Sequence, residues 1–329
     1  MGNIKEAIKD FRGKEIIVMG DVLLDKFTFG EINRLNPDHF AAPLVNVQRE
    51  EYVLGGAANV ANNVNSLGGT AYLFGLVGED EAGEIMKDEC ANRGIIHFLL
   101  KDENPTIVKQ RVIAHNKQVV RLDFGENSLE KMSEENEKSF LNILEKGIKG
   151  KDALVLSDYN KIFFRGSKNL AKEIISLGVK YGVPILSDIK PPNAGNFFGS
   201  NIISPNLKEA EEITGIKYTN EKSLEDMARY LNNSLGAEKI VITRGDKGVF
   251  GYDFQKRDYF LMKTNAKEVA DQTGAGDTFI ATMSLGVSSG LDLRDSLRLA
   301  NYASGIVVGK VGTATVHPSE LEKILKKRG

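Results

Sequence analysis

The run from Asp271 to Ile280 combines residue types that could carry chemistry, and it reads Asp-Gln-Thr-Gly-Ala-Gly-Asp-Thr-Phe-Ile. Small residues at 274–276 let the backbone approach a ligand, and the apolar and small residues that follow predict a buried helix. Backbone N–H groups at a helix N-terminus can cradle an anion and stabilise charge on a transferring phosphoryl group. In the first turn of that helix, Asp277 is kept ionised by the helix dipole and can accept a proton. The candidate catalytic residues are therefore Asp277, Gly274, Ala275 and Gly276.

Three other interpretations compete with an anion-binding turn at this segment. A Rossmann fingerprint requires a third glycine where Phe279 stands, and no long first strand precedes the turn. A Walker A loop requires Gly-Lys-Ser/Thr, which occurs nowhere in the chain. The third interpretation is a tight turn with an ordinary first-turn aspartate. From this segment alone, the anion-binding turn and the ordinary turn both stay open.

A second glycine-rich segment runs from Gly55 to Asn63 and reads Gly-Gly-Ala-Ala-Asn-Val-Ala-Asn-Asn. Its two glycines open a predicted helix with little side-chain bulk, which again permits close approach. In the first turn, Asn59 can offer both a donor and an acceptor to a hydroxyl group. The alternative is tight helix packing with no ligand. The candidate residues here are Gly55, Gly56 and Asn59.

Polar residues also follow the predicted strands. In open α/β sheets, ligands bind beyond the carboxyl ends of the strands. Asp21 ends the first strand, where it can bind sugar hydroxyls or cap the chain. Asn206 and Glu209 begin an acidic helix, where they can order the water shell of Mg²⁺ or serve as a helix start with an Asn cap. The loop 243–248 is either a nucleotide-side loop or a plain turn.

Buried strands that alternate with helices must position these residues. This pattern predicts an α/β fold with a doubly wound, mostly parallel, Rossmann-like sheet flanked by helices. The predicted strands are Glu15–Met19, Thr70–Leu76, Ala153–Ser157, Pro184–Asp188, Ile202–Ser204 and Lys239–Thr243. The predicted helices include Ala57–Leu67, Glu84–Arg93, Ser167–Tyr181 and Lys208–Ile213.

Two regions break this alternation, at about 27–52 and 105–124. Both are rich in β-branched and aromatic residues, and the second contains a hairpin pattern around residues 115–117. We predict antiparallel strands that project from the main sheet; the alternative is plain edge strands.

Lys109 and Arg111 share one face of a strand, and Arg121 lies on the next strand. These cations can grip a phosphate dianion or form a solvated charge row. No linker divides the chain, which predicts a single domain over 1–329.

The bulk composition excludes several classes of protein. The 43 Lys and Arg against 45 Asp and Glu give a net charge of −2, which argues against nucleic-acid or membrane partners. Cys90 is the only cysteine, so no internal disulfide can form, as suits a reducing cytosol. No apolar stretch is long enough to span a bilayer. The four histidines lack paired metal-ligand spacing. These features predict a soluble, cytoplasmic chain.

Taken together and in order, these segments resemble the ribokinase-like (PfkB-type) carbohydrate kinase family. Gly55-Gly56-x-x-Asn59 matches its N-terminal signature, Asp271–Thr278 its C-terminal signature, and Asn206-x-x-Glu209 its Mg²⁺-phosphate motif. The similarity runs from about Glu15 to Leu321. It implies a β-sheet lid, formed here from about 27–52 and 105–124, that often serves for dimerisation and so predicts a homodimer.

The same resemblance implies ATP as the phosphoryl donor and Mg²⁺ held through phosphates and water near Asn206 and Glu209. It also implies a monovalent cation such as K⁺, for which Asp271 and Thr273 match by position. The residues that it places at the nucleotide are Asn206, Glu209, Thr243, Gly245 and Asn301.

Within the family, the chain is most similar to kinases that phosphorylate D-glycero-β-D-manno-heptose 7-phosphate to the 1,7-bisphosphate. The stretches that carry this likeness are Gly20–Asp25, Val108–Ala114, Arg121–Phe124, Leu156–Tyr159, Leu299–Ala303 and Gly309–Val316. The adenylyltransferase domain that accompanies those kinases is expected to be absent, so a separate adenylyltransferase would act next. The implied substrate contacts are Asp21, Gly55, Gly56, Asn59, Lys109, Arg111, Arg121 and Asp158.

The chain departs from that subfamily near the expected sugar pocket, at His39, Phe40 and Leu54. Two alternatives therefore stay open. One is a ribokinase- or fructokinase-like enzyme for an unphosphorylated sugar, and the other is a catalytically silent regulator that binds a sugar or nucleotide.

Overall fold

A computed structural model describes residues 2–35, 42–167, 169–264, 271–310 and 312–328. His39 and Phe40 lie outside the described residues. The strands are β1 (Glu15–Gly20), β2 (Val22–Leu35), β3 (Pro43–Gly56), β4 (Thr70–Gly78), β5 (Ile96–Asp102), β6 (Val108–Ala114), β7 (Lys117–Phe124), β8 (Ala153–Ser157), β9 (Ile185–Asp188), β10 (Ile202–Ile203), β11 (Lys239–Thr243), β12 (Val249–Asp253) and β13 (Asp258–Met262). The α-helices are α1 (Gly2–Asp10), α2 (Ala57–Ser66), α3 (Glu81–Asn92), α4 (Glu134–Gly147), α5 (Leu170–Tyr181), α6 (Leu207–Thr214), α7 (Glu221–Leu235), α8 (Ala275–Ser288), α9 (Leu293–Val307) and α10 (Pro318–Arg328).

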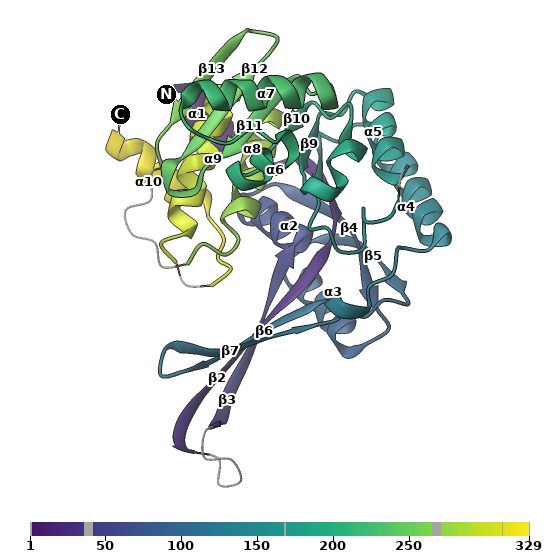
Figure 1. Ribbon diagram of the computed structural model, residues 1–329, viewed down its shortest axis with the longest axis vertical. Coiled ribbons are helices and arrows are strands. Elements are labelled where there is room, and N and C mark those ends of the chain that lie inside the picture. The colour runs from purple at the N-terminus through teal and green to yellow at the C-terminus, as the bar shows by residue number, and fades with distance from the viewer. Residues whose placement is uncertain (1, 36–41, 168, 265–270, 311, 329) are drawn as a thin grey trace.

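The main sheet has nine strands in the order β13-β12-β11-β10-β9-β8-β1-β4-β5. All neighbouring strands from β11 to β5 run parallel, and β12 and β13 add an antiparallel edge. The strand order reverses beside β1, because the chain passes first to β4 and β5 on one side and then to β8 on the other. The predicted doubly wound α/β sheet is confirmed (Figure 1).

Helices cover both faces of this sheet, as the burial of β1 shows. Ile16 and Val18 pack in one apolar cluster with residues of α1, α2, α8 and α9. Ile17 and Met19, which alternate with them, pack in a second cluster with residues of α4, α5 and α7. A strand buried on both faces reads as a continuous apolar run, which is why Glu15–Met19 was identifiable from the sequence.

The lid is a separate sheet of four strands in the order β3-β2-β6-β7, and it projects from the body of the molecule (Figure 1). Strands β6 and β7 form the predicted hairpin, and His115 and Asn116 at its turn have φ angles of 50° and 60°. Two successive positive φ values are what a two-residue hairpin turn with the right-handed twist requires.

The prediction that all lid strands are antiparallel was wrong at one pair, because β2 and β6 run parallel. After β3 the chain returns to the main sheet for α2, β4, α3 and β5, so β6 leaves the body in the same direction as β2. The lid strands are also longer than predicted. β2 begins at Val22 and β3 ends at Gly56, so the base of the lid is continuous with the end of β1 and the start of α2.

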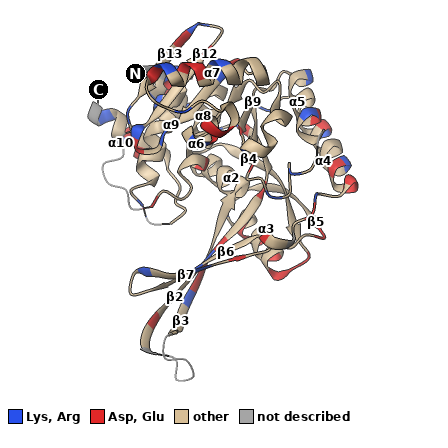
Figure 2. Ribbon diagram, in the orientation of Figure 1, with Lys and Arg blue, Asp and Glu red and all other residues tan. Residues whose placement is uncertain are grey.

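No helix in the described part of the chain is long and apolar enough to cross a membrane. In the view of Figure 2, acidic and basic residues lie interspersed along α4, α5 and the lid strands. That distribution agrees with the nearly balanced net charge.

Candidate active site

Asp277 lies in the first turn of α8 and packs against α2. The side-chain amide of Asn59 on α2 donates to Oδ2 of Asp277 at 2.7 Å. One turn further on, the Thr278 hydroxyl donates to Oδ1 of Asn63 at 2.9 Å, and the Asn63 amide donates back to Asn59. The Asn59 amide, which the sequence offered to a substrate hydroxyl, therefore holds the Asp277 carboxylate instead. The two glycine-rich segments meet at the contact between Asn59 and Asp277.

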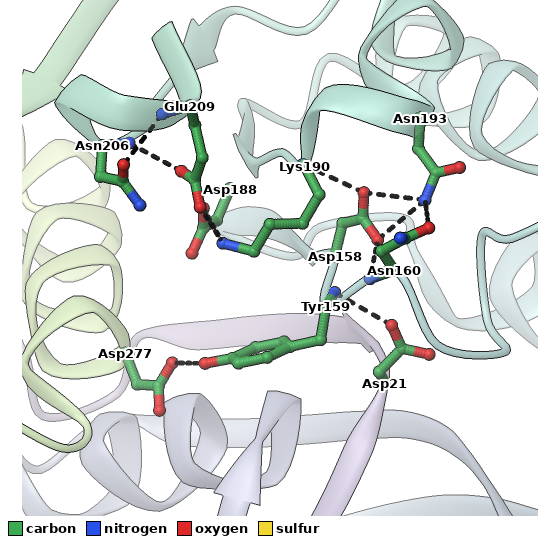
Figure 3. Close-up of polar contacts among 10 residues, drawn as sticks. All are labelled: Asp21, Asp158, Tyr159, Asn160, Asp188, Lys190, Asn193, Asn206, Glu209 and Asp277. Carbon is green, nitrogen blue, oxygen red and sulfur yellow. Dashed lines mark hydrogen bonds and ion pairs between the residues drawn. The ribbon is translucent and has the colours of Figure 1, made fainter. Parts of the chain in front are cut away.

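The other oxygen of Asp277 accepts a hydrogen bond from the hydroxyl of Tyr159, which follows β8 (Figure 3). Burial raises the pKa of Asp277 above its ordinary value, while the hydrogen bonds from Tyr159 and Asn59 oppose that rise. Ionisation is thus harder than the helix dipole alone predicted. Burial also raises the pKa of Tyr159, so the phenol stays protonated and donates.

The small residues before Asp277 serve two different purposes. Gly274 caps α8 with a φ of 78°, and a Cβ on it would lie 2.8 Å from Nδ2 of Asn59. Glycine there satisfies the turn and leaves room for Asn59. A Cβ on Gly276 would meet nothing within 4 Å, so that side of the turn is open. The amide of Ala275 turns back to the carbonyl of Gln272 at 3.3 Å, which leaves it a poorer anion donor than predicted.

Beside this turn lies a cavity of about 150 Å³. A water molecule occupies about 30 Å³ in the liquid, so the cavity can accept a group of phosphoryl size. It is lined by Tyr159, Asp188, Lys190, Ser204, Asn206, Glu209, Thr243, Gly274, Gly276, Asp277, Phe279 and Ile280.

Asn206 and Glu209 form a capping box at the start of α6, which is the alternative that the sequence left open. The Glu209 amide donates to Oδ1 of Asn206 at 3.0 Å, and the Asn206 amide donates to Oε2 of Glu209 at 2.8 Å. Oε1 of Glu209 is 2.6 Å from Nζ of Lys190 (Figure 3). Both residues nevertheless line the cavity, so capping also fixes their position beside any phosphate bound there.

Asp21 and Asp158 bind the chain itself, in contrast to their predicted sugar contacts. Asp21 accepts four backbone N–H groups, from Tyr159, Lys161, Ile162 and Phe163, at 2.8–3.1 Å. Asp158 accepts the backbone amides of Asn160 and Lys190 and the side-chain amide of Asn193 at 2.7–3.1 Å. Burial raises the pKa of Asp158 to about 6. These contacts favour the capping interpretation for Asp21 and give Asp158 a similar part.

The paired glycines before α2 allow close approach of β3 to β2 rather than to a ligand. A Cβ on Gly55 would lie 2.8 Å from Oδ2 of Asp25, and one on Gly56 would lie 2.4 Å from the carbonyl of Asp21. The buried Asp25 forms an ion pair with Arg111 of β6. Its charge also acts on Asp277.

The three predicted lid cations lie together as expected. Arg111 pairs directly with Arg121 across the hairpin, and Lys109 pairs with Asp123. Arg121 forms two hydrogen bonds with Asp123, at 2.7 and 3.0 Å. Among the described residues, Lys109 makes no ion pair within 4 Å, and burial lowers its pKa. Lys109 is therefore a partly desolvated cation whose ammonium group can still donate to an anion.

The remaining predicted residues lie around this centre. Thr243 lines the cavity, whereas Gly245 begins a short 3₁₀ turn just after it. The Asn301 side chain donates to the carbonyl of Lys263 at 2.8 Å, away from the cavity lining.

Asp271 joins two loops. One of its oxygens accepts the amide and hydroxyl of Thr273 at 2.9 and 2.7 Å, and the other accepts the amide of Gly312 at 3.3 Å. Burial opposes its ionisation, but these hydrogen bonds keep the pKa of Asp271 below its ordinary value.

Sequence reasoning missed Tyr159, Asp188 and Lys190, which line the cavity. Asp188 ends a correctly predicted strand and Lys190 follows it, so the rule that selected Asp21 could also have selected them. Tyr159 follows β8 in the same way. Among the described residues, no three acidic, histidine or cysteine side chains are grouped to hold a metal ion.

Comparison with known proteins gives a family for this geometry. Residues 24–320 match the pfkB family carbohydrate kinases. This chain belongs to the pfkB family. Its members transfer a phosphoryl group to an alcohol group of a carbohydrate.

Two pfkB-family relatives are similar over nearly the whole chain. The bifunctional protein HldE of Proteus mirabilis is 34% identical over 99% of this chain, and that of Haemophilus influenzae is 36% identical over 97%. The chain spans 66% and 65% of the length of these two relatives.

Solved structures of low identity share the fold of this pfkB kinase. Phosphofructokinase-2 from Escherichia coli, solved in complex with substrates and products and also with potassium, has a TM-score of 0.78 at 18% identity. Arabidopsis thaliana ribokinase, complexed with ribose and ATP, has a TM-score of 0.73 at 19% identity. In both comparisons 96% of this chain and 99% of the other chain are covered.

Proposed function

We propose that this chain transfers the γ-phosphoryl group of ATP to O1 of D-glycero-β-D-manno-heptose 7-phosphate, giving the 1,7-bisphosphate. The observation that carries the chemistry is the placement of Asp277. Its carboxylate is buried at the N-terminus of α8, is held by Asn59 and Tyr159, and borders a cavity of phosphoryl size.

In the proposed reaction, Asp277 takes the proton of the attacking hydroxyl. A carboxylate is a weak base for a free hydroxyl, but proton transfer can come late, after a loose transition state has made the attacking oxygen acidic. The raised pKa of Asp277 makes it a stronger base once ionised. Apart from that of Ala275, which faces the carbonyl of Gln272, the amides at the start of α8 lack partners within the helix and can stabilise charge on the phosphoryl group.

The residues present fit ATP with Mg²⁺. Glu209, Asp188 and Asn206 bring oxygen atoms to one side of the cavity, and Mg²⁺ prefers oxygen ligands and retains several waters. Both oxygens of Glu209 already have partners, so contact through water suits the site. Bound Mg²⁺ would neutralise phosphate charge. The ribokinase named above was solved with ATP.

A monovalent cation is also proposed, beside Asp271. This carboxylate joins the loop before α8 to the loop at Gly312, so a cation there would stiffen the anion-binding turn. The phosphofructokinase-2 structure with potassium supports the idea by analogy of fold.

The choice of a phosphorylated sugar rests on the lid. An unphosphorylated sugar needs hydroxyl partners but no cations at the far end of its site. Here Lys109, Arg111 and Arg121 share one face of the lid. Among the described residues Lys109 makes no ion pair within 4 Å, although the charges of Glu126 and Asp25 act on it. The arginines can be shared between their carboxylates and a phosphate, since a guanidinium has five donors.

A panel of sugars with ADP release as readout tests the proposal. We expect heptose 7-phosphate to give the highest kcat/KM, followed by other sugar phosphates, with ribose and fructose far behind. Faster phosphorylation of ribose or fructose than of any hexose or heptose phosphate would contradict the heptose assignment. ADP release with none of the sugars, although ATP binds, would support a silent regulator.

We also propose that two copies of the chain associate through their lids. Along β7, Val120, Leu122 and Phe124 alternate, so they share a face, and they are 43%, 41% and 49% exposed. A second lid would cover this apolar row and the edge of β7.

A further inference from the structure

Lys190 follows β9 and reaches into the cavity beside Asp277 (Figure 3). Among the described residues that line this cavity, it alone carries a positive charge. The carboxylates of Asp188, Glu209 and Asp277 lie around the same space. A site for a phosphoryl group therefore has three negative side chains and one positive side chain.

The backbone of Lys190 is fixed by a hydrogen bond, whereas its side chain is held by two carboxylates and lies over the ring of Tyr159, with Nζ 5.5 Å from the ring centre. The Lys190 amide donates to Oδ2 of Asp158 at 3.1 Å, and Asp158 is itself held by Asn160 and Asn193. At the other end, Nζ lies 2.6 Å from Oε1 of Glu209 and 3.8 Å from Oδ1 of Asp188. Burial works against the charge, but these carboxylates hold the pKa of Lys190 above its ordinary value.

A purely structural ion pair is the simpler interpretation of this contact, but two observations count against it. Glu209 already fixes α6 through its other oxygen, so Lys190 is not needed for the cap. Lys190 is also the one positive side chain of the described cavity lining, so it can add to the charge that Mg²⁺ would bring to a bound phosphate. A lysine has a flexible stem and three donors, which suits movement from one partner to another.

We propose that Lys190 is a catalytic residue whose ammonium group leaves Glu209 and donates to a non-bridging oxygen of the phosphoryl group in transit. In that step the bond from Pγ to the β,γ-bridging oxygen breaks and the bond from Pγ to the sugar oxygen forms. The hydroxyl proton goes to Asp277, and Lys190 keeps its own proton. This inference rests on ATP as the phosphoryl donor.

The test compares Lys190→Met with Lys190→Arg. Removing one charged donor to a transition state costs about a hundredfold to a thousandfold in kcat, so we expect such a loss in Lys190→Met with nearly unchanged KM for ATP. Lys190→Arg should recover part of it. Lys180→Met is the matched control, because Lys180 is an exposed lysine paired with Glu145 far from the cavity lining.

A binding measurement separates this role from a structural one. ADP with aluminium fluoride imitates the phosphoryl group in transit, and calorimetry can measure its binding in the absence of any sugar. We expect Lys190→Met to bind ADP alone as the wild type does and to lose about a hundredfold or more of the extra affinity that aluminium fluoride gives, in line with the lost kcat.

Equal binding of the fluoride complex by wild type and Lys190→Met, or an unchanged kcat, would overturn the proposal. So would a loss of ADP affinity as large as the loss for the fluoride complex. Because this readout needs no sugar, it does not depend on heptose 7-phosphate being the substrate. If Lys190→Met does not fold, Lys190→Arg and Lys190→Gln give the same comparison.

Discussion

The Asp277 site and the lid hold their polar groups in opposite ways. At the Asp277 site, side chains from α2, α8 and the loop after β8 are buried, and each predicted polar group has a protein partner. The lid is a single sheet layer, and its strand β7 is exposed along its whole length. Of its three predicted cations, Arg121 is held by the exposed Asp123 and Arg111 by the buried Asp25, and Lys109 has no carboxylate within 4 Å among the described residues.

This difference suits the Asp277 site to the phosphoryl transfer and the lid to recognition of the sugar. A buried network with all partners present positions a base to within small tolerances, and it changes little with the sugar. An exposed sheet with exchangeable ion pairs can meet different substrates through a few side chains. Substitutions in the first region should therefore change kcat, and substitutions in the second should change KM for the sugar.

The largest effect is expected at the base. Asp277→Asn keeps the shape of the side chain but cannot accept the hydroxyl proton. We expect a loss of about two or more orders of magnitude in kcat, the usual scale for a general base, with ATP binding retained in calorimetry. Melting temperature controls for folding. Turnover at the wild-type level would remove Asp277 from its proposed role.

Next in size is the effect at the lid. Lys109→Met removes a charged donor without removing the stem, and hydrogen bonds to charged groups contribute about 1.5–3 kcal/mol. We expect KM for the sugar phosphate to rise about tenfold to a hundredfold, with KM for ATP and kcat nearly unchanged. Lys117→Met, at the exposed end of the same hairpin, is the control. A fall in kcat with an unchanged KM would contradict the division between the two regions.

A smaller and pH-dependent effect is expected at Tyr159. The reaction needs ionised Asp277, so the rate should fall as the pH drops through the raised pKa of that carboxyl. Tyr159 favours the ionised form by donating to it, so Tyr159→Phe should raise that pKa further.

The acid limb of the kcat profile of Tyr159→Phe should thus move to higher pH, while the rate at alkaline pH stays close to that of the wild type. The charges near Asp277 that also act on it are Lys190, Asp188 and Asp25, and all three are unchanged in this variant. The exposed Tyr230→Phe serves as control. An acid limb that does not move would show that the phenol has no part in setting the base.

The smallest effect on activity is expected on the apolar face of the lid. Leu122→Glu places a charge in the row with Val120 and Phe124, and should convert a dimer to a monomer in light scattering. Since Leu122 is exposed, the melting temperature of the monomer should change little. Gln118→Glu on the same strand should leave the dimer intact. A wild type that is already monomeric at working concentration would refute association through the lids.

Sequence patterns predicted the parallel sheet well, because strands buried on both faces are continuous apolar runs. They also selected Asp277 and Asn59, although not the contact between them, which joins residues 218 positions apart. The same patterns failed at the β2–β6 pair, and they left two interpretations of Asp21 open. A carboxylate at a strand end looks alike whether it faces a ligand or backbone amides, and strand direction depends on the path of the chain between strands. The partner of a carboxylate and the direction of a strand both depend on residues far away in the sequence, so local patterns cannot predict them.

The four amides on Asp21 also bear on how the protein assembles. They come from residues 138–142 positions later in the chain, and Asp21 sits where β1 ends beside β8. Closing so long a segment is slow, because its entropy is lost before the contacts form. The loop that carries Tyr159 can take shape only after β1 and β8 have paired. Catalytic competence should therefore appear late in folding, and a newly made chain would remain inactive until its central strands have found each other.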